Sequence, residues 1–276
     1  MAIDDSNPYA APQARPGTPP LHEGENTGES FESEYLPNSS RAQAASILLG
    51  LTLLLNLTGV VSDYMQINLL QRIEAAVPVT QAEIDGNDLR VGLLGVATLL
   101  LLIPTIVAFC MWGVRAYRNL PALGARDLRT TPGWAAGAFF VPILNLFRPF
   151  QIYAETWKAS DPSVAVSDAY HRANLSAMVV GWWWTFWLLS NVVNNFAGRM
   201  ALNANATVQD LIFSSWASLV GFLLSAVAAG LAILVIKQIT DRQEEKSQQI
   251  LTGFPGGMIE PKANDWPFVE PENDFR

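Results

Sequence analysis

VGLLGVATLLLLIPTIVAFCMWGV, residues 91–114, contains no charged side chain and is long enough to cross a membrane as a helix. At about 1.5 Å of rise per residue this helix extends about 36 Å, whereas the hydrocarbon core of a bilayer is about 30 Å thick. Three further charge-free apolar runs have a similar length, at residues 42–62, 173–198 and 211–236. We therefore expect an all-α integral membrane protein with four transmembrane helices, the second of them kinked at Pro104.

The composition places most of the apolar material in these runs and most of the acidic residues at the two ends. Hydrophobic residues make up 50% of the 276 residues, and the formal net charge is -8. Seven acids lie in residues 1–42 and eight lie after Ile236. The basic residues form no Arg-rich face, so we expect no nucleic-acid partner. Cys110 is the only cysteine, which excludes an intramolecular disulfide and any multi-cysteine metal site.

Three regions follow from this pattern. Residues 1–41 are acidic and Pro-rich and are expected to form a disordered tail, without the basic and apolar segments of a cleavable signal peptide. Residues 42–250 are expected to form the four-helix membrane domain, and residues 251–276 a second disordered tail. The tails are candidate docking segments for cytoplasmic proteins, although a solvated linker is the simpler interpretation of the first.

A fifth uncharged stretch opens the string TPGWAAGAFFVPILNLFRPFQ, residues 131–151. Pro132 and Pro142 interrupt helical continuity, which a segment buried in protein tolerates better than a simple spanning helix does. We therefore expect a re-entrant or interfacial segment between the second and third spans. After it, Phe150, Tyr153, Ala154 and Trp157 recur at helical spacing, which predicts an amphipathic helix lying in the membrane interface.

The distribution of Lys and Arg predicts the orientation in the membrane. The connection between the second and third spans holds seven basic residues, whereas residues 63–90 hold two and residues 199–210 hold one. Cytoplasmic loops carry the excess of Lys and Arg, so both termini should be cytoplasmic. If the uncharged stretch at residues 130–147 crossed the membrane fully, these seven basic residues would be divided between the two sides. An even number of crossings fits better.

Local signals define some helix ends. The apolar pattern of the first span continues past Asp63, and the last helix is expected to continue through Lys246. Thr80 and Glu83 have the spacing of a capping box, which predicts the start of a short helix. The run Asp-Gly-Asn-Asp at residues 85–88 then predicts a turn before the second span.

Small residues recur every four positions on the last span, as Ala217, Gly221, Ser225 and Ala229. Such a stripe permits close packing of another helix, from the same chain or from a second copy in a homo-oligomer. Gly133 and Gly137 have the same spacing on the segment 131–151, although one such pair is weak evidence.

The residues offer little for catalysis. The spacing of Asp168 and His171 would place both on one face of a helix just before the third span, but two isolated groups fall short of a metal or acid–base site. We therefore expect no enzyme, no metal and no cofactor. No ionisable residue lies within the four apolar runs, which argues against an ion-coupled pump.

Two strings in the centre of the chain are similar to a known family. The first runs from Trp112 through Arg115 and Asn119 into LGARDL, residues 123–128, and the second is the segment 131–151. In these strings the chain resembles the domain of unknown function 4328. The resemblance is specific over residues 112–158 and extends loosely over residues 42–250. It implies a multi-pass protein of the bacterial inner membrane with no established activity.

Two functions from different classes fit these features. The first is a non-catalytic membrane module that organises partners or senses the bilayer, with the segment 131–151 at its centre. The alternative is a small transporter or channel-like carrier of a lipid or neutral solute, gated near Pro142 and Asn145, because irregular backbone at membrane depth borders cavities. Trp134, Asn145 and Arg148 are also candidates for a lipid head group. The candidate functional or structural residues are Arg115, Asn119, Pro132, Gly133, Trp134, Pro142, Asn145, Arg148, Pro149 and Gln151.

Overall fold

The computed structural model describes residues 34–163 and 175–252, and all the regular structure in these residues is helical. Four long helices lie in the unit that begins at Tyr35. They are α1 (Ser39–Glu74), α2 (Gln81–Arg118), α6 (Met178–Ala201) and α7 (Val208–Leu251). The predicted all-α class is confirmed for this part of the chain.

Three of the long helices, α1, α2 and α7, are long and apolar enough to cross a membrane. This finding is consistent with the predicted membrane protein. The helix α6 is not among the three, although it has 24 residues. Asparagine and tryptophan occupy many of its positions, and both lower its mean hydropathy relative to the aliphatic runs of the other three.

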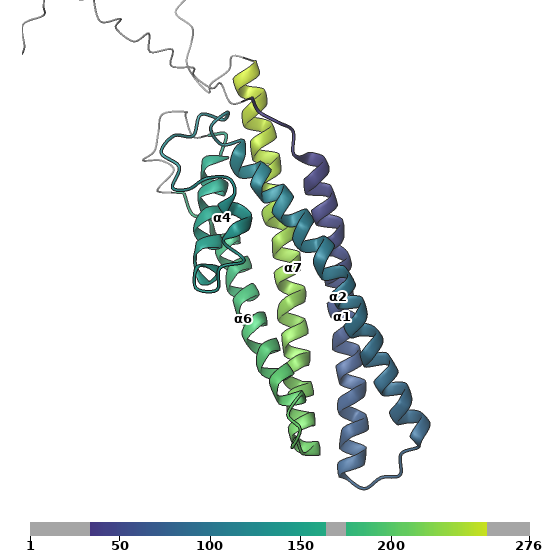
Figure 1. The fold of residues 1–276 in the computed structure, drawn as a ribbon. Coiled ribbons are helices and arrows are strands. Elements are labelled where there is room, and N and C mark those ends of the chain that lie inside the picture. Colours follow the sequence, from purple (N-terminus) through teal and green to yellow (C-terminus); the bar gives the residue numbers. More distant parts are fainter. Residues whose placement is uncertain (1–33, 164–174, 253–276) are drawn as a thin grey trace, which may run out of the picture. The chain divides into compact units, whose positions relative to one another are not determined.

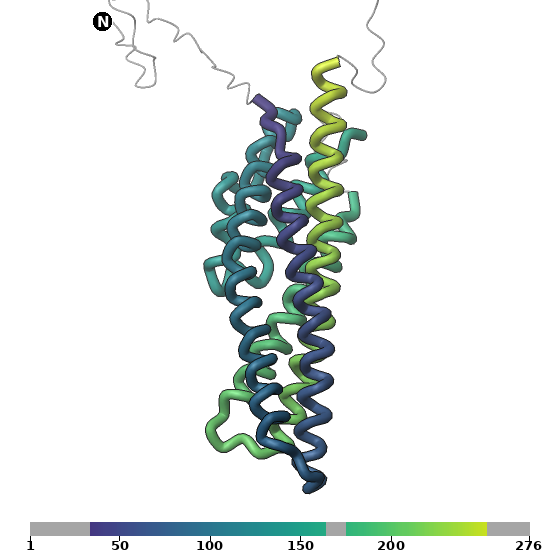
Figure 2. Tube along the Cα trace, turned by 90° about the vertical axis from the view of Figure 1, so that its right-hand side faces the viewer, coloured from purple at the N-terminus to yellow at the C-terminus, as the bar shows by residue number. Residues whose placement is uncertain are grey.

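The long helices form two hairpins. Residues 75–80 join α1 to α2, and residues 202–207 join α6 to α7 (Figure 1). Both connections lie at one end of the bundle, which we call the loop end. The opposite end, where α1 begins and α7 ends, is called the tail end. The helix α7 packs along both α1 and α6, whereas α2 packs mainly on α1 (Figure 2).

Glycine permits two close helix contacts of α7. A Cβ at Gly59 of α1 would lie 2.9 Å from the Phe222 ring, and a Cβ at Gly221 would collide with Asn194 of α6. Asn194 also donates to Ser225 Oγ over 3.2 Å. The stripe of small residues on α7 therefore receives α6 of the same chain at these positions, and self-association through it stays a prediction.

Helix ends agree with the sequence in three places and differ in one. The extension of α1 beyond Asp63, the extension of α7 through Lys246 and the capping box at Thr80 are all confirmed. The turn predicted at residues 85–88 is wrong, because α2 is continuous from Gln81 to Arg118. A glycine inside a helix costs only about 1 kcal/mol, and the capping box already starts the helix in register.

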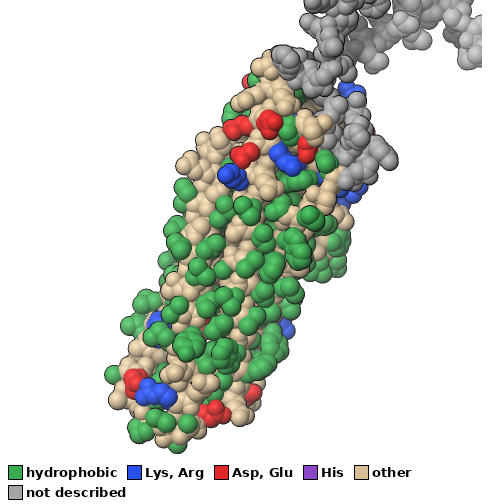
Figure 3. Space-filling model, turned by 180° about the vertical axis from the view of Figure 1, so that it is seen from behind, with side chains coloured by type: hydrophobic (Ala, Val, Ile, Leu, Met, Phe, Trp, Pro, Cys, Tyr) green, Lys and Arg blue, Asp and Glu red, His purple; other side chains and the backbone are tan. Residues whose placement is uncertain are grey.

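The outer surface of the bundle is apolar along its middle. Seen from behind, apolar side chains cover the middle of the helices, and Lys, Arg, Asp and Glu gather toward the two ends (Figure 3). Leu100 and Ile103 of α2 are 72% and 68% exposed. Apolar surface of this extent is unusual on a soluble monomer and is typical of a helix that faces lipid.

Residues 131–151 and the helix after them fold against the tail-end half of the bundle (Figure 1). They form α3 (Trp134–Gly137), a 3₁₀ turn η1 (Leu144–Leu146) and α4 (Arg148–Ala159). The structure corrects the predicted interfacial face of α4. Tyr153 and Trp157 are buried inside the protein, whereas Phe150 is 38% exposed.

Some predictions concern residues outside the described ranges. The disordered tails were predicted at residues 1–41 and 251–276, of which residues 1–33 and 253–276 are not described. The helix α1 begins at Ser39, three residues before the predicted start of the membrane domain at residue 42. The pair Asp168 and His171 lies in the undescribed residues 164–174.

Candidate functional site

Asn119 connects the end of α2 to the residues that precede α1. Its side chain donates to the Leu36 carbonyl over 2.8 Å and accepts from the Leu36 N–H over 3.3 Å. Nearby, Asn38 donates to the Trp112 carbonyl over 3.1 Å. Both asparagines are 1% exposed, so these bonds form away from water. The predicted site residue Asn119 is therefore a structural link between α1 and α2.

Gln243 of α7 connects the last turn of α2 with the residue that follows α4. Its Nε2 donates to the Ala116 carbonyl of α2 over 2.8 Å and to Ser160 Oγ, just after α4, over 3.0 Å. The carbonyls of the last turn of a helix lack intrahelical partners, and the Leu120 N–H bonds to the Tyr117 carbonyl instead of Ala116. Gln243 thus satisfies a terminal carbonyl of α2 while it fixes the end of α4.

Three further hydrogen bonds fix the region at the tail end. The Tyr117 hydroxyl donates to Glu155 over 2.8 Å, and the same carboxylate accepts from the Arg129 N–H over 3.2 Å. This joins α2, the connection before α3, and α4. On the side of α7, Lys246 Nζ donates to the Ala159 carbonyl over 3.1 Å.

Asp161 and Arg242 form an ion pair of 2.7 Å beside Trp157. The Arg242 guanidinium also lies 3.7 Å from the centroid of the Trp157 ring, a cation–π contact. Burial acts to raise the pKa of Asp161, but hydrogen bonds from Ser163 and the positive charges of Arg242 and Lys246 outweigh it and lower the pKa below its ordinary value. The pair is therefore ionised at neutral pH and attaches the end of α4 to α7.

An aromatic cluster holds residues 131–151 against α2 and α6. Tyr153 stacks on Trp112, with centroids 5.8 Å apart, and its hydroxyl donates to the Ala135 carbonyl over 3.1 Å. Phe139 contacts four rings, and Trp184 of α6 donates to the Leu146 carbonyl over 3.1 Å. The rings around Phe139 are Phe109, Tyr153, Trp184 and Trp187.

These ring contacts give the depth of the segment within the bundle. Phe109 lies nine residues before the end of α2 at Arg118, and Trp187 lies nine residues after the start of α6 at Met178. At 1.5 Å per residue both distances are about 14 Å along the helix axis. Phe139 therefore lies about 14 Å from these two helix ends, in the direction of the loop end.

The turn beyond Phe139 is apolar and exposed. Phe140 and Ile143 are 66% and 74% exposed, and Leu146 and Phe147 are also exposed. Pro142 lies in this turn. Asn145 is partly buried, and its Oδ1 has no hydrogen-bond partner among the described residues. The chain then returns through α4 to the tail end.

The remaining predicted site residues lie around this segment. Arg148 donates to Gln151 over 3.1 Å in the first turn of α4, where Pro149 lies at a position that needs no N–H donor. Pro132 precedes the single turn of α3, at whose start Trp134 is 40% exposed.

The two other predicted site residues are Arg115 and Gly133. Arg115 lies at the tail end, where it is partly buried near the like charges of Arg41 and Arg118. Gly133 marks no close helix contact, since a Cβ there would meet nothing within 4 Å, and a Cβ at Gly137 would meet only Trp134.

The sequence alone did not identify Gln243 or Thr240 as site residues. Thr240 accepts a hydrogen bond from the Trp112 indole over 3.1 Å. The helical spacing of Ile239, Gln243 and Lys246 places them on one face of α7, but polar residues at this spacing are also typical of a solvated helix. The described residues contain no group of three His, Cys, Asp or Glu that could hold a metal ion. These hydrogen bonds and ring contacts hold the apolar turn in place beside the bundle.

Comparison with models of known protein families gives a match. A family model matches residues 76–241, more than half of the chain, while searches among curated proteins and among solved structures found none. The matched range contains the segment 131–151 and ends within α7, so that α1 and Gln243 lie outside it. The match confirms the resemblance carried by residues 112–158. The chain belongs to the family described as Domain of unknown function (DUF4328).

Proposed function

We propose that the chain is a four-span protein of the bacterial inner membrane in which residues 131–151 enter the membrane from the cytoplasmic side and return to it. The contact made by Gln243 supports this proposal best. One side chain bonds to Ala116 and to Ser160, so the chain before and after the segment lies at the same level of the bundle. The segment then adds no crossing, and the basic residues around it stay on the cytoplasmic side, together with both tails.

The helix α6 supplies the fourth crossing in this proposal. It packs along α7, and no charged residue lies between its start and Arg199 near its end. Its outward side is apolar, with Trp182, Val192 and Phe196 between 49% and 67% exposed. Asn194 donates to Ser225 of α7, while the exposed Asn191 and Asn195 donate to backbone carbonyls of α6 itself. Polar side chains that find partners in this way are tolerated in spanning helices.

Within this architecture, we propose that the chain acts as a non-catalytic membrane module that organises partners or senses the bilayer. Acidic groups near the segment are engaged in structural contacts, as in the pairs Tyr117–Glu155 and Asp161–Arg242. The exposed turn around Phe140 and Ile143 presents apolar side chains to its surroundings. Such a turn suits contact with acyl chains or with another membrane helix, whereas the tails suit contact with soluble proteins.

The topology is tested by reporters of membrane side fused at four positions. Fusions after Arg118 and after Arg172 should report the cytoplasm, while insertions in the connections 75–80 and 202–207 should report the other side. Opposite signals after Arg118 and Arg172 would mean that the segment crosses the membrane, and the layout would be wrong.

The proposed role is tested by affinity purification from detergent. The full chain is compared with variants that lack residues 1–33 or 253–276 and with a variant in which Phe140 and Ile143 are both replaced by serine. We expect at least one of these changes to remove a specific partner. If the set of partners is the same for all four proteins, the role as an organising module is contradicted.

A carrier of a lipid or neutral solute is the second candidate, and one observation favours it. The Oδ1 of Asn145 is buried next to the proline-containing turn and has no hydrogen-bond partner within residues 34–163 and 175–252. A polar group of this kind suits a solute that passes the turn. Flux into proteoliposomes should then fall when Asn145 is replaced by leucine or Arg148 by glutamine. Flux that is equal in both variants and in the unaltered protein would remove the basis for a carrier.

A further inference from the structure

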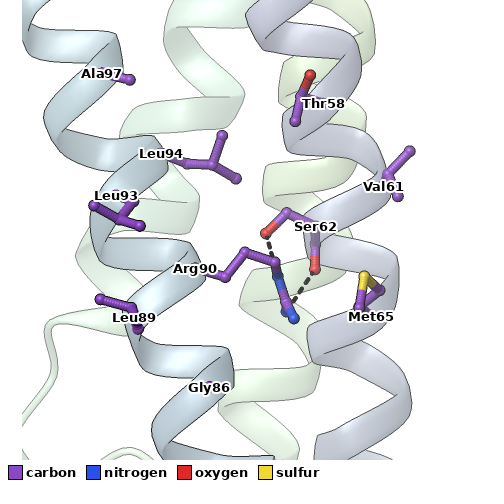
Figure 4. Close-up of a pocket in the computed structure, with 10 residues that line it drawn as sticks. All are labelled: Thr58, Val61, Ser62, Met65, Gly86, Leu89, Arg90, Leu93, Leu94 and Ala97. Carbon is purple, nitrogen blue, oxygen red and sulfur yellow. Dashed lines mark hydrogen bonds between the residues drawn. The ribbon is translucent and has the colours of Figure 1, made fainter.

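A groove between α1 and α2 near the loop end combines apolar walls with one arginine (Figure 4). Its volume is about 510 Å³, within the range of roughly 300–1,000 Å³ that is usual for ligand sites. The walls come from Val61, Met65, Leu89, Leu93, Leu94 and Ala97. This groove is remote from residues 131–151, which lie in the tail-end half of the bundle (Figure 1).

Arg90 of α2 extends across the groove to α1. Its Nε donates to Ser62 Oγ over 3.1 Å, and its Nη2 donates to the Ser62 carbonyl over 3.2 Å and to Asn87 Oδ1 over 2.6 Å. A guanidinium has five N–H donors, and these bonds use three. The two donors on Nη1 have no hydrogen-bond partner in the described part of the chain.

The charge of Arg90 is not neutralised by an ion pair. Its three partner atoms are neutral oxygens, and no described carboxylate oxygen lies within the 4.0 Å of an ion pair. Glu83 is paired with Arg72 over 2.6 Å. Asp63 of α1 interacts electrostatically with Arg90, but it is buried and bonds to Ser218 of α7. The groove therefore has positive charge available to an anion.

The position of Arg90 along α2 relates the groove to the bilayer. It is the last charged residue before the uncharged run 91–114, so it lies where the hydrocarbon core meets the head groups if α2 spans the membrane. In Figure 4, Leu94, Ala97 and Thr58 lie on one side of the guanidinium and Gly86 on the other. The side with Leu94 and Ala97 leads into the membrane core.

We propose that this groove binds an anionic phospholipid of the leaflet at the loop end, with its phosphate on Arg90 and an acyl chain along the walls toward Ala97. Guanidinium donors match phosphate oxygens in geometry and charge, and the apolar walls match the chain. The inference depends on α1 and α2 spanning the membrane. It does not depend on the path of residues 131–151 or on any protein partner, so its failure would leave the proposed function intact.

The test measures lipid binding to the purified full-length chain in detergent by native mass spectrometry. The probes are phosphatidylglycerol, which is anionic, phosphatidylcholine, which is zwitterionic, and inorganic phosphate as a competitor. Arg90→Gln removes the charge, and Ala97→Trp fills the apolar part while Arg90 stays. Arg199→Gln is the matched control, because Arg199 is an exposed arginine at the loop end of α6.

We expect Arg90→Gln to weaken phosphatidylglycerol binding roughly 10- to 100-fold, as for loss of a charge-assisted hydrogen bond. Ala97→Trp should weaken it as well, the control should stay within twofold, and phosphatidylcholine should bind less tightly than phosphatidylglycerol. Equal binding in all variants would overturn the proposal. If inorganic phosphate competes fully and Ala97→Trp has no effect, the groove is an anion site without a lipid chain. If the chain is a dimer that Ala97→Trp dissociates, a second copy of the chain occupies the groove. Either result would also overturn it.

Discussion

Phe139 is expected to hold residues 131–151 in place, and its replacement by alanine should release them. The ring contacts four aromatic neighbours with centroids 5.9–6.1 Å apart. Each such pair contributes about 0.5–1.5 kcal/mol beyond burial of area. Burial of the ring adds little to this free energy, because the ring would move from the protein interior into lipid or detergent, which is also apolar. Because the four pairs share one ring and are not additive, we expect a loss of about 2–3 kcal/mol.

This loss predicts how often the segment detaches. Since 1.4 kcal/mol corresponds to a factor of ten, the detached population should rise roughly 30- to 150-fold. The native Cys110 reports this population, because it is the only cysteine and lies next to Phe109, partly buried and near Tyr153. The rate of modification of Cys110 by a thiol-reactive dye in detergent should rise by a similar factor, as long as the segment reattaches faster than the dye reacts.

The neighbouring residue provides the control. Phe140 is 66% exposed, so Phe140→Ala should leave the rate of Cys110 modification unchanged. Circular dichroism should show the same helix content in both variants. If Phe139→Ala changes the rate less than threefold, or if Phe140→Ala changes it as much, the aromatic cluster does not hold the segment.

Three further predictions concern the contacts at the tail end. Gly113→Ala should destabilise the protein by about 1–3 kcal/mol, because the new Cβ collides with the Tyr153 hydroxyl. In a double-mutant cycle measured by thermal unfolding, Tyr153→Phe should recover part of this loss. Gln243→Leu should cost about 1–3 kcal/mol, because the Ala116 carbonyl loses its donor; an unfolding midpoint equal to that of the unaltered protein would contradict the link. The lowered pKa of Asp161 contributes stability above its unfolded value of about 3.9, and this is lost as the pH falls through the folded pKa. The stability difference between the unaltered protein and Asp161→Asn should therefore be constant from pH 7 to 5 and shrink below about pH 4, and a difference that does not depend on pH would refute this.

The sequence predicted the long helices because charge-free apolar runs of this length form few structures other than membrane-spanning helices. It misplaced their ends where local composition and helical context disagree. Residues 85–88 have the composition of a turn, yet they continue α2, since the capping box at Thr80 precedes them and the apolar run follows. Periodicity likewise found the apolar face of α4, but it does not distinguish protein from lipid as the neighbour of Tyr153.

The candidate site was predicted only in part. Its motif residues lie close together in the sequence and stand out there, but the residues they bond to lie far away along the chain. Asn119 stood out in the motif, but its partner Leu36 is 83 residues away. Gln243 lies in a polar stretch that indicates a solvated helix, although it is 0% exposed. A single sequence carries no direct signal for such distant pairs.

The continuity of α2 joins two regions of the molecule that are far apart. Arg90 and Arg118 lie on one helix, 28 residues and about 42 Å apart along its axis. Near one end this helix forms a wall of the groove, and near the other it carries Tyr117, which is bonded to Glu155 of α4. Hydrogen bonds between Thr52 and Thr105 and from Arg90 to Ser62 attach the helix to α1. The groove at the loop end and the contact that holds α4 at the tail end are therefore parts of one continuous helix.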